Sequence, residues 1–201
     1  MKKILPFFSY ILHPVFIPLF GTLFYIILDE NYFTFPQVLV LLLQIIIISI
    51  LLPIAFFFLL RTFGKIDNIM LSDLSQRKIP LLLQIMLFSV LVTKSITLER
   101  FPELHYFFMG GIISSIVAFV LLYIKIKASI HLIGTSALTI FVLGLSYHNQ
   151  VNIINTIIFI MILNGFVASS RLEMKAHNTK ELVFGFFVGA LPQIGLLFFW
   201  L

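Results

Sequence analysis

Seven long apolar segments, separated by short polar connections, make up most of this chain. A helix needs about 20 residues, and at least about 17, to cross the hydrocarbon core of a bilayer. Backbone polar groups in lipid are satisfied only in helices or closed barrels, and the long apolar runs do not alternate as barrel strands do. The pattern therefore predicts an all-α polytopic membrane protein with segments over residues 4–28, 36–60, 80–98, 104–124, 131–147, 151–168 and 182–201.

The first segment differs from the others because it contains Pro6, Pro14, Pro18 and His13. Each proline removes a backbone donor and kinks a helix. The segment is therefore either a kinked span or a re-entrant hairpin, and we expect the kinked span. The predicted bundle has six core transmembrane helices, to which this segment adds a seventh.

Composition supports the membrane class. Of the 201 residues, 61% are hydrophobic and 10% are charged, whereas soluble domains carry about 25% charged residues. We expect one integral membrane domain over 1–201. Cysteine is absent, which excludes disulfides and thiolate metal sites. The net charge of +5 points to topology and to phosphate or lipid headgroups rather than to nucleic acid.

Basic residues are distributed unevenly between the two ends of the predicted spans. With seven crossings, the positive-inside rule places the N-terminal side in the cytoplasm, whereas six crossings turn the same connections outward. Both topologies stay open, and we expect a protein of the bacterial inner (cytoplasmic) membrane. With seven crossings, eleven of the thirteen Lys and Arg residues lie on the N-terminal side: Lys2, Lys3, Arg61, Lys65, Arg77, Lys78, Lys125, Lys127, Arg171, Lys175 and Lys180.

The densest polar run is 169–181, which reads S-S-R-L-E-M-K-A-H-N-T-K-E between two apolar segments. Charges at a membrane border serve either loop solvation or a site. On a helix, His177 and Glu181 would share a face, so the carboxylate could accept from one imidazole nitrogen and leave the other free. A histidine prepared in this way can act as a nucleophile or a base. Arg171 could offer a fork of donors to the anion that this histidine attacks.

The polar clusters are separated by even numbers of spans. Two spans separate the adjacent pair Arg77 and Lys78 from the connection that leads to His131. Two more lie between His131 and the stretch that holds Arg171 and His177. An even number of crossings returns the chain to its starting side. We therefore expect all three clusters to meet at one membrane face.

Three short stretches carry a resemblance to a known family. Residues 170–181 read S-R, five residues, H, three residues, E, while 128–131 read A-S-I-H and 77–80 read R-K-I-P. In this order they resemble the third, second and first signatures, S-R-x5-H-x3-D, P-S-G-H and K-x6-R-P, of the type 2 phosphatidic acid phosphatase superfamily (lipid phosphatases and vanadium haloperoxidase-like proteins). The resemblance covers roughly residues 65–201.

The resemblance implies a six-helix transmembrane phosphatase-like bundle. Its lipid phosphatases are metal-independent and act within the membrane on lipid phosphates and polyprenyl pyrophosphates, and we expect no cofactor in this chain. Carried over by motif, His177 would attack phosphorus and form a phosphohistidine, and Glu181 would orient it. His131 would protonate the leaving alcohol. A nucleophile and an acid on opposite sides of phosphorus suit an in-line displacement.

The resemblance also implies a set of phosphate-binding residues. Arg171 would bind phosphate oxygens, and Ser129 would donate a hydrogen bond to them. Arg77 or Lys78 would supply the positive charge of the first motif. Fixed cationic donors stabilise the charge that develops on the equatorial oxygens of a phosphoryl transition state.

The chain departs from the family pattern in all three motifs. Met70 stands where the first motif has lysine, Ala128 and Ile130 replace the Pro and Gly of the second motif, and Glu181 replaces Asp. A divergent but active lipid phosphatase is our first hypothesis. The alternative is a catalytically weakened relative that binds or transports a lipid headgroup.

Plain structural roles compete with site roles at several positions. For Arg77 the alternative is a surface ion pair with Asp73, four residues earlier. We expect Lys127 to be a topology determinant and His13 to be an interhelical hydrogen-bonding group. The G-x-x-x-G pair at 185–189 predicts close helix packing.

Overall fold

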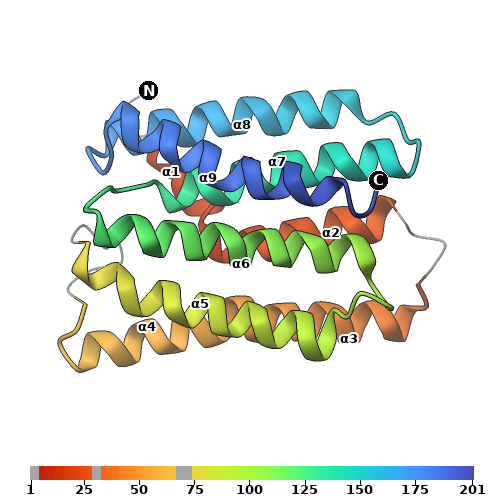
Figure 1. Cartoon of the computed structure of the whole chain (residues 1–201), viewed down its shortest axis with the longest axis horizontal. Coiled ribbons are helices and arrows are strands. Elements are labelled where there is room, and N and C mark those ends of the chain that lie inside the picture. Colours follow the sequence, from red (N-terminus) through yellow and green to blue (C-terminus); the bar gives the residue numbers. More distant parts are fainter. Residues whose placement is uncertain (1–4, 29–32, 67–73) are drawn as a thin grey trace.

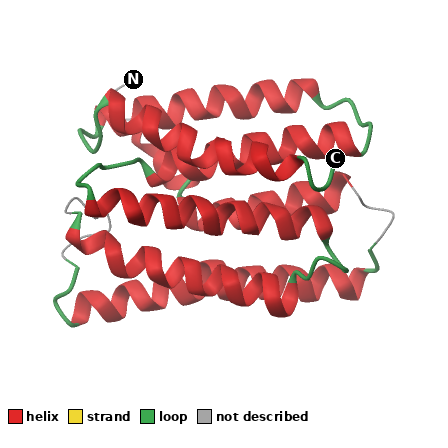
Figure 2. Cartoon of the chain, in the orientation of Figure 1, coloured by secondary structure: helices red, strands yellow, loops and turns green. Residues whose placement is uncertain are grey.

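The structure, a computed structural model, describes residues 5–28, 33–66 and 74–201. Within these residues all regular secondary structure is helical and no strand occurs (Figure 2). The chain is therefore an all-α integral membrane protein, as the hydrophobic pattern predicts. Seven of its described helical segments are long and apolar enough to cross a membrane: Leu5–Leu28, Phe35–Thr62, Ser75–Ser95, Pro102–Tyr123, Ile130–His148, Ile154–Glu173 and Thr179–Leu197.

The seven spans lie side by side, and their ends form two opposite faces (Figure 1). Four helices begin at one face, which we call the N-terminal face: α1 (Leu5–Ile11), α5 (Lys78–Val90), α7 (Ile130–His148) and α9 (Thr179–Leu197). Three begin at the opposite face: α3 (Phe35–Ile45), α6 (Pro102–Tyr123) and α8 (Ile154–Glu173). The residues that open α5, α7 and α9 therefore share the N-terminal face with the end of α8.

The second and third spans include short segments of a different helical pitch. In the second span a π-helical segment, η3 (Ile46–Leu51), joins α3 to α4 (Leu52–Thr62). It ends two residues before Pro53, which has no backbone N–H and therefore cannot continue the regular bonding pattern. The third span opens with the 3-10 turn η4 (Ser75–Arg77) and ends in a π-helical segment, η5 (Leu91–Ser95).

The first span is broken at His13, between α1 and the 3-10 turn η1 (Pro14–Phe16), and α2 (Ile17–Leu28) completes it. A residue that precedes proline is disfavoured in the helical conformation, and His13 is extended, with φ −65° and ψ 139°. The segment nevertheless runs from the N-terminal face to the opposite face (Figure 1). It is the kinked span expected from its prolines, and it is one of seven membrane-length helical segments among the described residues.

The most buried span is α7, and α9 packs closely against it. A Cβ atom at Gly185 would lie 2.6 Å from the carbonyl oxygen of Ser129, and one at Gly189 would overlap the carbonyl of Ile133. The prediction of close helix packing at this glycine pair is confirmed. The contact holds the start of α9 against the start of α7.

Candidate functional site

A cavity of about 330 Å³ lies among the first three spans and the polar residues of the N-terminal face. Four of the residues predicted for the site line it: Arg77, His131, Arg171 and His177. The structure therefore brings one residue or more from each of the three motifs to a single cavity. Most of the remaining wall is apolar and comes from the second and third spans, including Ile54, Phe57 and Leu87.

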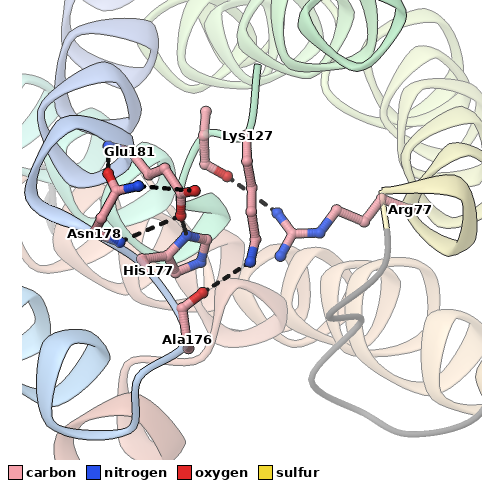
Figure 3. Close-up of polar contacts among 7 residues, drawn as sticks. Arg77, Lys127, Ala176, His177, Asn178 and Glu181 are labelled. Atoms are coloured by element: carbon pink, nitrogen blue, oxygen red, sulfur yellow. Dashed lines mark hydrogen bonds and ion pairs between the residues drawn. The ribbon is translucent and has the colours of Figure 1, made fainter. Parts of the chain in front are cut away.

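His177 lies in the turn between α8 and α9, just before the N-cap residue Asn178. The helix begins only at Thr179, so His177 and Glu181 do not share one helix. Their contact forms nonetheless across the helix start, with Nδ1 of His177 2.8 Å from Oε2 of Glu181 (Figure 3). A carboxylate only accepts, so Nδ1 carries the hydrogen and Nε2 keeps its lone pair.

Glu181 is itself held in place by the start of α9. Its backbone N–H donates to Oδ1 of Asn178 at 3.0 Å, and its carboxylate accepts from the backbone N–H of Asn178 at 3.4 Å, which forms a capping box. The longer arm of Glu181, relative to the Asp of the family signature, therefore does not prevent contact with His177. The carboxylate fixes both the ring orientation and the tautomer of the histidine.

The surroundings of His177 favour a neutral ring. Burial, and then the positive charges of Arg77, Arg171 and Lys127, lower the pKa of His177 to about 3. These effects outweigh the neighbouring Glu181 carboxylate, so the imidazole is neutral at pH 7. Figure 3 shows Arg77 and Lys127 extending toward the His177 ring. A neutral ring with a free Nε2 lone pair beside fixed cations is suited to attack on an anionic phosphoryl group.

Two arginines are buried at the cavity. Arg77 ends η4 and Arg171 lies in the last turn of α8, and each is only 3% exposed. Nη1 of Arg77 donates to the carbonyl oxygen of Ala128 at 3.2 Å, which ties the first motif to the second. The burial of Arg77 contradicts the alternative of a surface position, and its postulated partner Asp73 lies outside the described residues. Buried guanidinium groups at a largely apolar cavity favour an anionic ligand with oxygen acceptors.

His131 reaches the cavity from the first turn of α7, and one of its nitrogens is already engaged. Its Nε2 lies 3.1 Å from the carbonyl oxygen of Ser9 in α1. Because a carbonyl only accepts, Nε2 carries the hydrogen and donates it to Ser9. The nitrogen therefore has to exchange this partner before it can donate to a leaving group.

Ser129 is the N-cap residue of α7, and it is fully buried. Its backbone N–H donates to the backbone carbonyl of Glu181 at 3.1 Å. Its hydroxyl has no hydrogen-bond partner in the described part of the chain, and Ser129 is not among the residues that line the cavity. The side chain predicted to donate to phosphate is therefore close to the site but does not border its cavity.

Lys78 is turned away from the site. Its Nζ atom lies 5.0 Å from the centroid of the Tyr123 ring, a cation–π contact with the end of α6, and Lys78 does not line the cavity. Of the two residues considered for the charge of the first motif, the structure brings Arg77 to the cavity and not Lys78.

Lys127 was expected to serve topology alone, but the structure places it beside the site. Its Nζ donates to the carbonyl oxygen of Ala176 at 2.9 Å, and burial, followed by the charge of Arg77, lowers the pKa of Lys127. The signal in the sequence was its position two residues before Ser129, within the connection that carries the second motif.

The first span supplies further side chains that motif matching did not select. Ser9, Tyr10 and His13 all line the cavity. The hydroxyl of Ser9 lies 2.6 Å from that of Ser170, directly before Arg171. A histidine followed by proline in a membrane span was the available signal, because it marks a polar side chain at a helix break.

Among the described residues, no three His, Cys, Asp or Glu side chains lie close enough together to hold a metal ion. The charged groups that the structure does place at the cavity are cationic. Comparisons of the chain with protein-family models, with characterised proteins and with solved structures found no match. The family resemblance therefore stays a prediction that depends on the motif residues and their geometry.

Proposed function

We propose that this protein hydrolyses a phosphate ester or pyrophosphate of a membrane lipid, through a phosphohistidine at His177. The observation that carries the proposal is the 2.8 Å contact between Nδ1 of His177 and Glu181 at a cavity that Arg77 and Arg171 also line. This contact leaves Nε2 as the free nucleophilic atom. The buried arginines supply the positive charge that a phosphoryl group requires.

In the first step, the Nε2 lone pair of His177 forms a bond to phosphorus and the bond to the leaving oxygen breaks. Arg77 and Arg171 neutralise the equatorial oxygens, and Glu181 stabilises the imidazole as it becomes positive. The leaving oxygen takes the bonding pair and a proton, which the family resemblance assigns to His131 in its protonated form. In the second step, water attacks phosphorus and gives a proton back to His131, the bond between phosphorus and Nε2 breaks, and phosphate leaves as His177 returns to its neutral form.

The apolar wall of the cavity supports a lipid rather than a soluble substrate. Ile54 and Phe57 of α4 and Leu87 of α5 continue the cavity away from the charged residues and into the bundle. A phosphate held at the cationic end would place its hydrocarbon chain along this apolar wall. Phosphatidic acid, phosphatidylglycerophosphate and polyprenyl pyrophosphates share this chemistry. We propose the bacterial inner membrane as the location.

A second function is favoured by the contact between His131 and Ser9. With its Nε2–H donated to a carbonyl oxygen, His131 is not poised as an acid. The same charges would then bind a lipid headgroup, for carriage or anchoring, without turnover.

Phosphate release from dioleoyl phosphatidic acid by the purified protein in detergent tests the two functions. If the protein is a hydrolase, His177→Ala should lower the rate of phosphate release by about 10³-fold or more. The thermal unfolding midpoint of the variant should stay that of the wild type. Arg61→Ala is the matched control, because Arg61 is exposed at the end of α4 and does not line the cavity. Binding without release in the wild type would establish the second function. Neither binding nor release, with this lipid or with a polyprenyl pyrophosphate, would refute both.

A further inference from the structure

His13 brings a third imidazole to the cavity, from a span that lies outside all three motifs. Its ring centroid is 5.2 Å from that of His131, and the two rings are nearly perpendicular, at 85°. The helix break before Pro14 removes His13 from the regular helix, so its side chain is not confined to a helical face. The first span thus contributes a polar group to the same cavity as His177.

The hydrogen bond of its Nδ1 atom sets the tautomer of His13. The backbone N–H of Val15 donates to Nδ1 at 3.3 Å, as a cap of η1. A nitrogen that accepts carries no hydrogen, so the hydrogen of the neutral ring is on Nε2. Within the part of the chain that the structure describes, no residue accepts from this Nε2–H.

His131, in contrast to His13, already donates its ring N–H to a carbonyl oxygen. The break at His13 removes the N–H that would return to the Ser9 carbonyl in a continuous helix, and His131 Nε2–H takes its place at 3.1 Å. Of the two adjacent imidazoles, His131 therefore has its N–H donor committed to the backbone. His13 has its N–H donor uncommitted at a cavity that Arg171 also lines.

We propose that His13 is a substrate-contacting residue whose Nε2–H donates a hydrogen bond to an oxygen of the phosphoryl group held by Arg77 and Arg171. The proposal rests on the proposed function for the identity of the ligand as a lipid phosphate. The hydrogen stays on His13 throughout, so the proton balance of the hydrolysis is unchanged. The first span is then part of the phosphate site rather than an addition to the bundle.

Two substitutions separate the roles of the two ring nitrogens. His13→Asn keeps an acceptor near the position of Nδ1, which can cap η1, and has no donor at the distal position. His13→Gln places an amide N–H near the position of Nε2 and caps less well. Binding of dioctanoyl phosphatidic acid to the purified protein is measured by calorimetry in a His177→Gln background, where turnover does not interfere.

We expect His13→Asn to weaken binding by about 10- to 100-fold, the value of one hydrogen bond to a charged group. We expect His13→Gln to stay within about threefold of its parent. A purely structural cap predicts the reverse order, and that order, or equal binding by both variants, would overturn the proposal. His105→Gln is the control, because His105 lies toward the opposite face, with Nδ1 2.7 Å from the carbonyl oxygen of Ile96.

The outcome also distinguishes this inference from the proposed hydrolysis. If the protein with His177 intact binds the same lipid but releases no phosphate, the hydrolysis fails, and the order of the two His13 variants still decides the inference. If phosphate is released and His13→Asn binds as tightly as its parent, the inference fails and the hydrolysis stands. Absence of binding in the parent, both with this lipid and with a polyprenyl pyrophosphate, would reject both.

Discussion

The Nζ atom of Lys127 lies 2.9 Å from the carbonyl oxygen of Ala176, so the connection before α7 is tied to the turn before α9. The next residue along that turn is His177. The hydrogen bond therefore fixes the backbone from which the candidate nucleophile projects. It also places a cation close enough to contribute to the lowered pKa of His177.

Replacement of Lys127 by Met should reduce phosphate release by about 10-fold, because the turn loses a charge-assisted hydrogen bond worth about 1.5–3 kcal/mol. Initial rates with phosphatidic acid check this. Lys125→Met is the matched control, since Lys125 is exposed in the same connection. An equal loss in both variants would show that the general charge of the connection matters and not the contact with Ala176.

The first motif can be tested by comparing two adjacent basic residues. Arg77→Gln should reduce turnover by about 10²-fold or more, because it removes a buried charge from the cavity wall. Lys78→Gln should reduce it by less than about threefold, because Lys78 faces Tyr123. Rates measured at equal amounts of folded protein check the order. A larger loss in Lys78→Gln would mean that the charge of the first motif comes from Lys78.

The variant Glu181→Gln separates the role of Glu181 in orienting His177 from the role of its negative charge. Glutamine also suits the third position of a capping box, so the start of α9 should persist. The neutral amide no longer stabilises a developing imidazolium, and turnover should fall by about 10²-fold with little change in thermal stability. Asn178→Ala should show the opposite pattern, a loss of stability of about 1 kcal/mol with turnover largely kept. Full activity in Glu181→Gln would refute a role for the carboxylate charge.

The lowered pKa of His177 predicts a pH dependence of stability. Between the unfolded value of about 6.5 and the folded value of about 3, the unfolded chain binds a proton that the folded protein does not. The free energy of unfolding should therefore decrease as the pH falls through this window. His177→Gln removes this contribution, so thermal unfolding curves from pH 7 to pH 4.5 should show a smaller decrease than in the wild type. Parallel decreases would show that His177 is not held neutral.

Packing of α9 on α7 predicts a strong effect at one glycine. In Gly185→Ala the new Cβ would lie 2.6 Å from the carbonyl oxygen of Ser129, and this backbone atom cannot move aside easily. We expect a destabilisation of about 1–3 kcal/mol and a loss of turnover. Gly195→Ala on the same helix has open space around its Cβ and should be neutral or slightly stabilising. Similar effects of both would indicate that helix propensity, and not the contact, decides the result.

The spans were predictable because apolar length is a strong signal, and their ends were less so. The sixth segment was expected over 151–168, whereas α8 continues to Glu173 and includes Arg171. Polar residues ended the predicted segment, but here the arginine is buried inside the protein and does not face lipid. Hydropathy cannot distinguish a charge that ends a helix from one that the bundle encloses.

The meeting of the motifs at one face followed from counting spans, but the direction of each side chain did not. Arg77 and Lys78 are neighbours in the sequence, and only the packing of α5 against α6 decides which one faces the cavity. The contribution of His13 depends on contacts of the first span with α7, more than 100 residues later. The spacing of residues within a motif carries no information on contacts between segments so far apart in the sequence. Motif matching therefore did not identify the first span as part of the site.

The contacts of the helix that precedes Pro14 also determine which parts of this protein can be removed or supplied separately. Since α1 gives a backbone oxygen to His131 and a hydroxyl partner to Ser170, deletion of its residues would leave both side chains without these hydrogen-bond partners. We expect an affinity tag after Leu201, at the opposite face of the bundle, to be tolerated more readily than deletion of the opening helix. Split-protein complementation, with residues 1–28 supplied as a separate peptide, would restore what such a deletion removes.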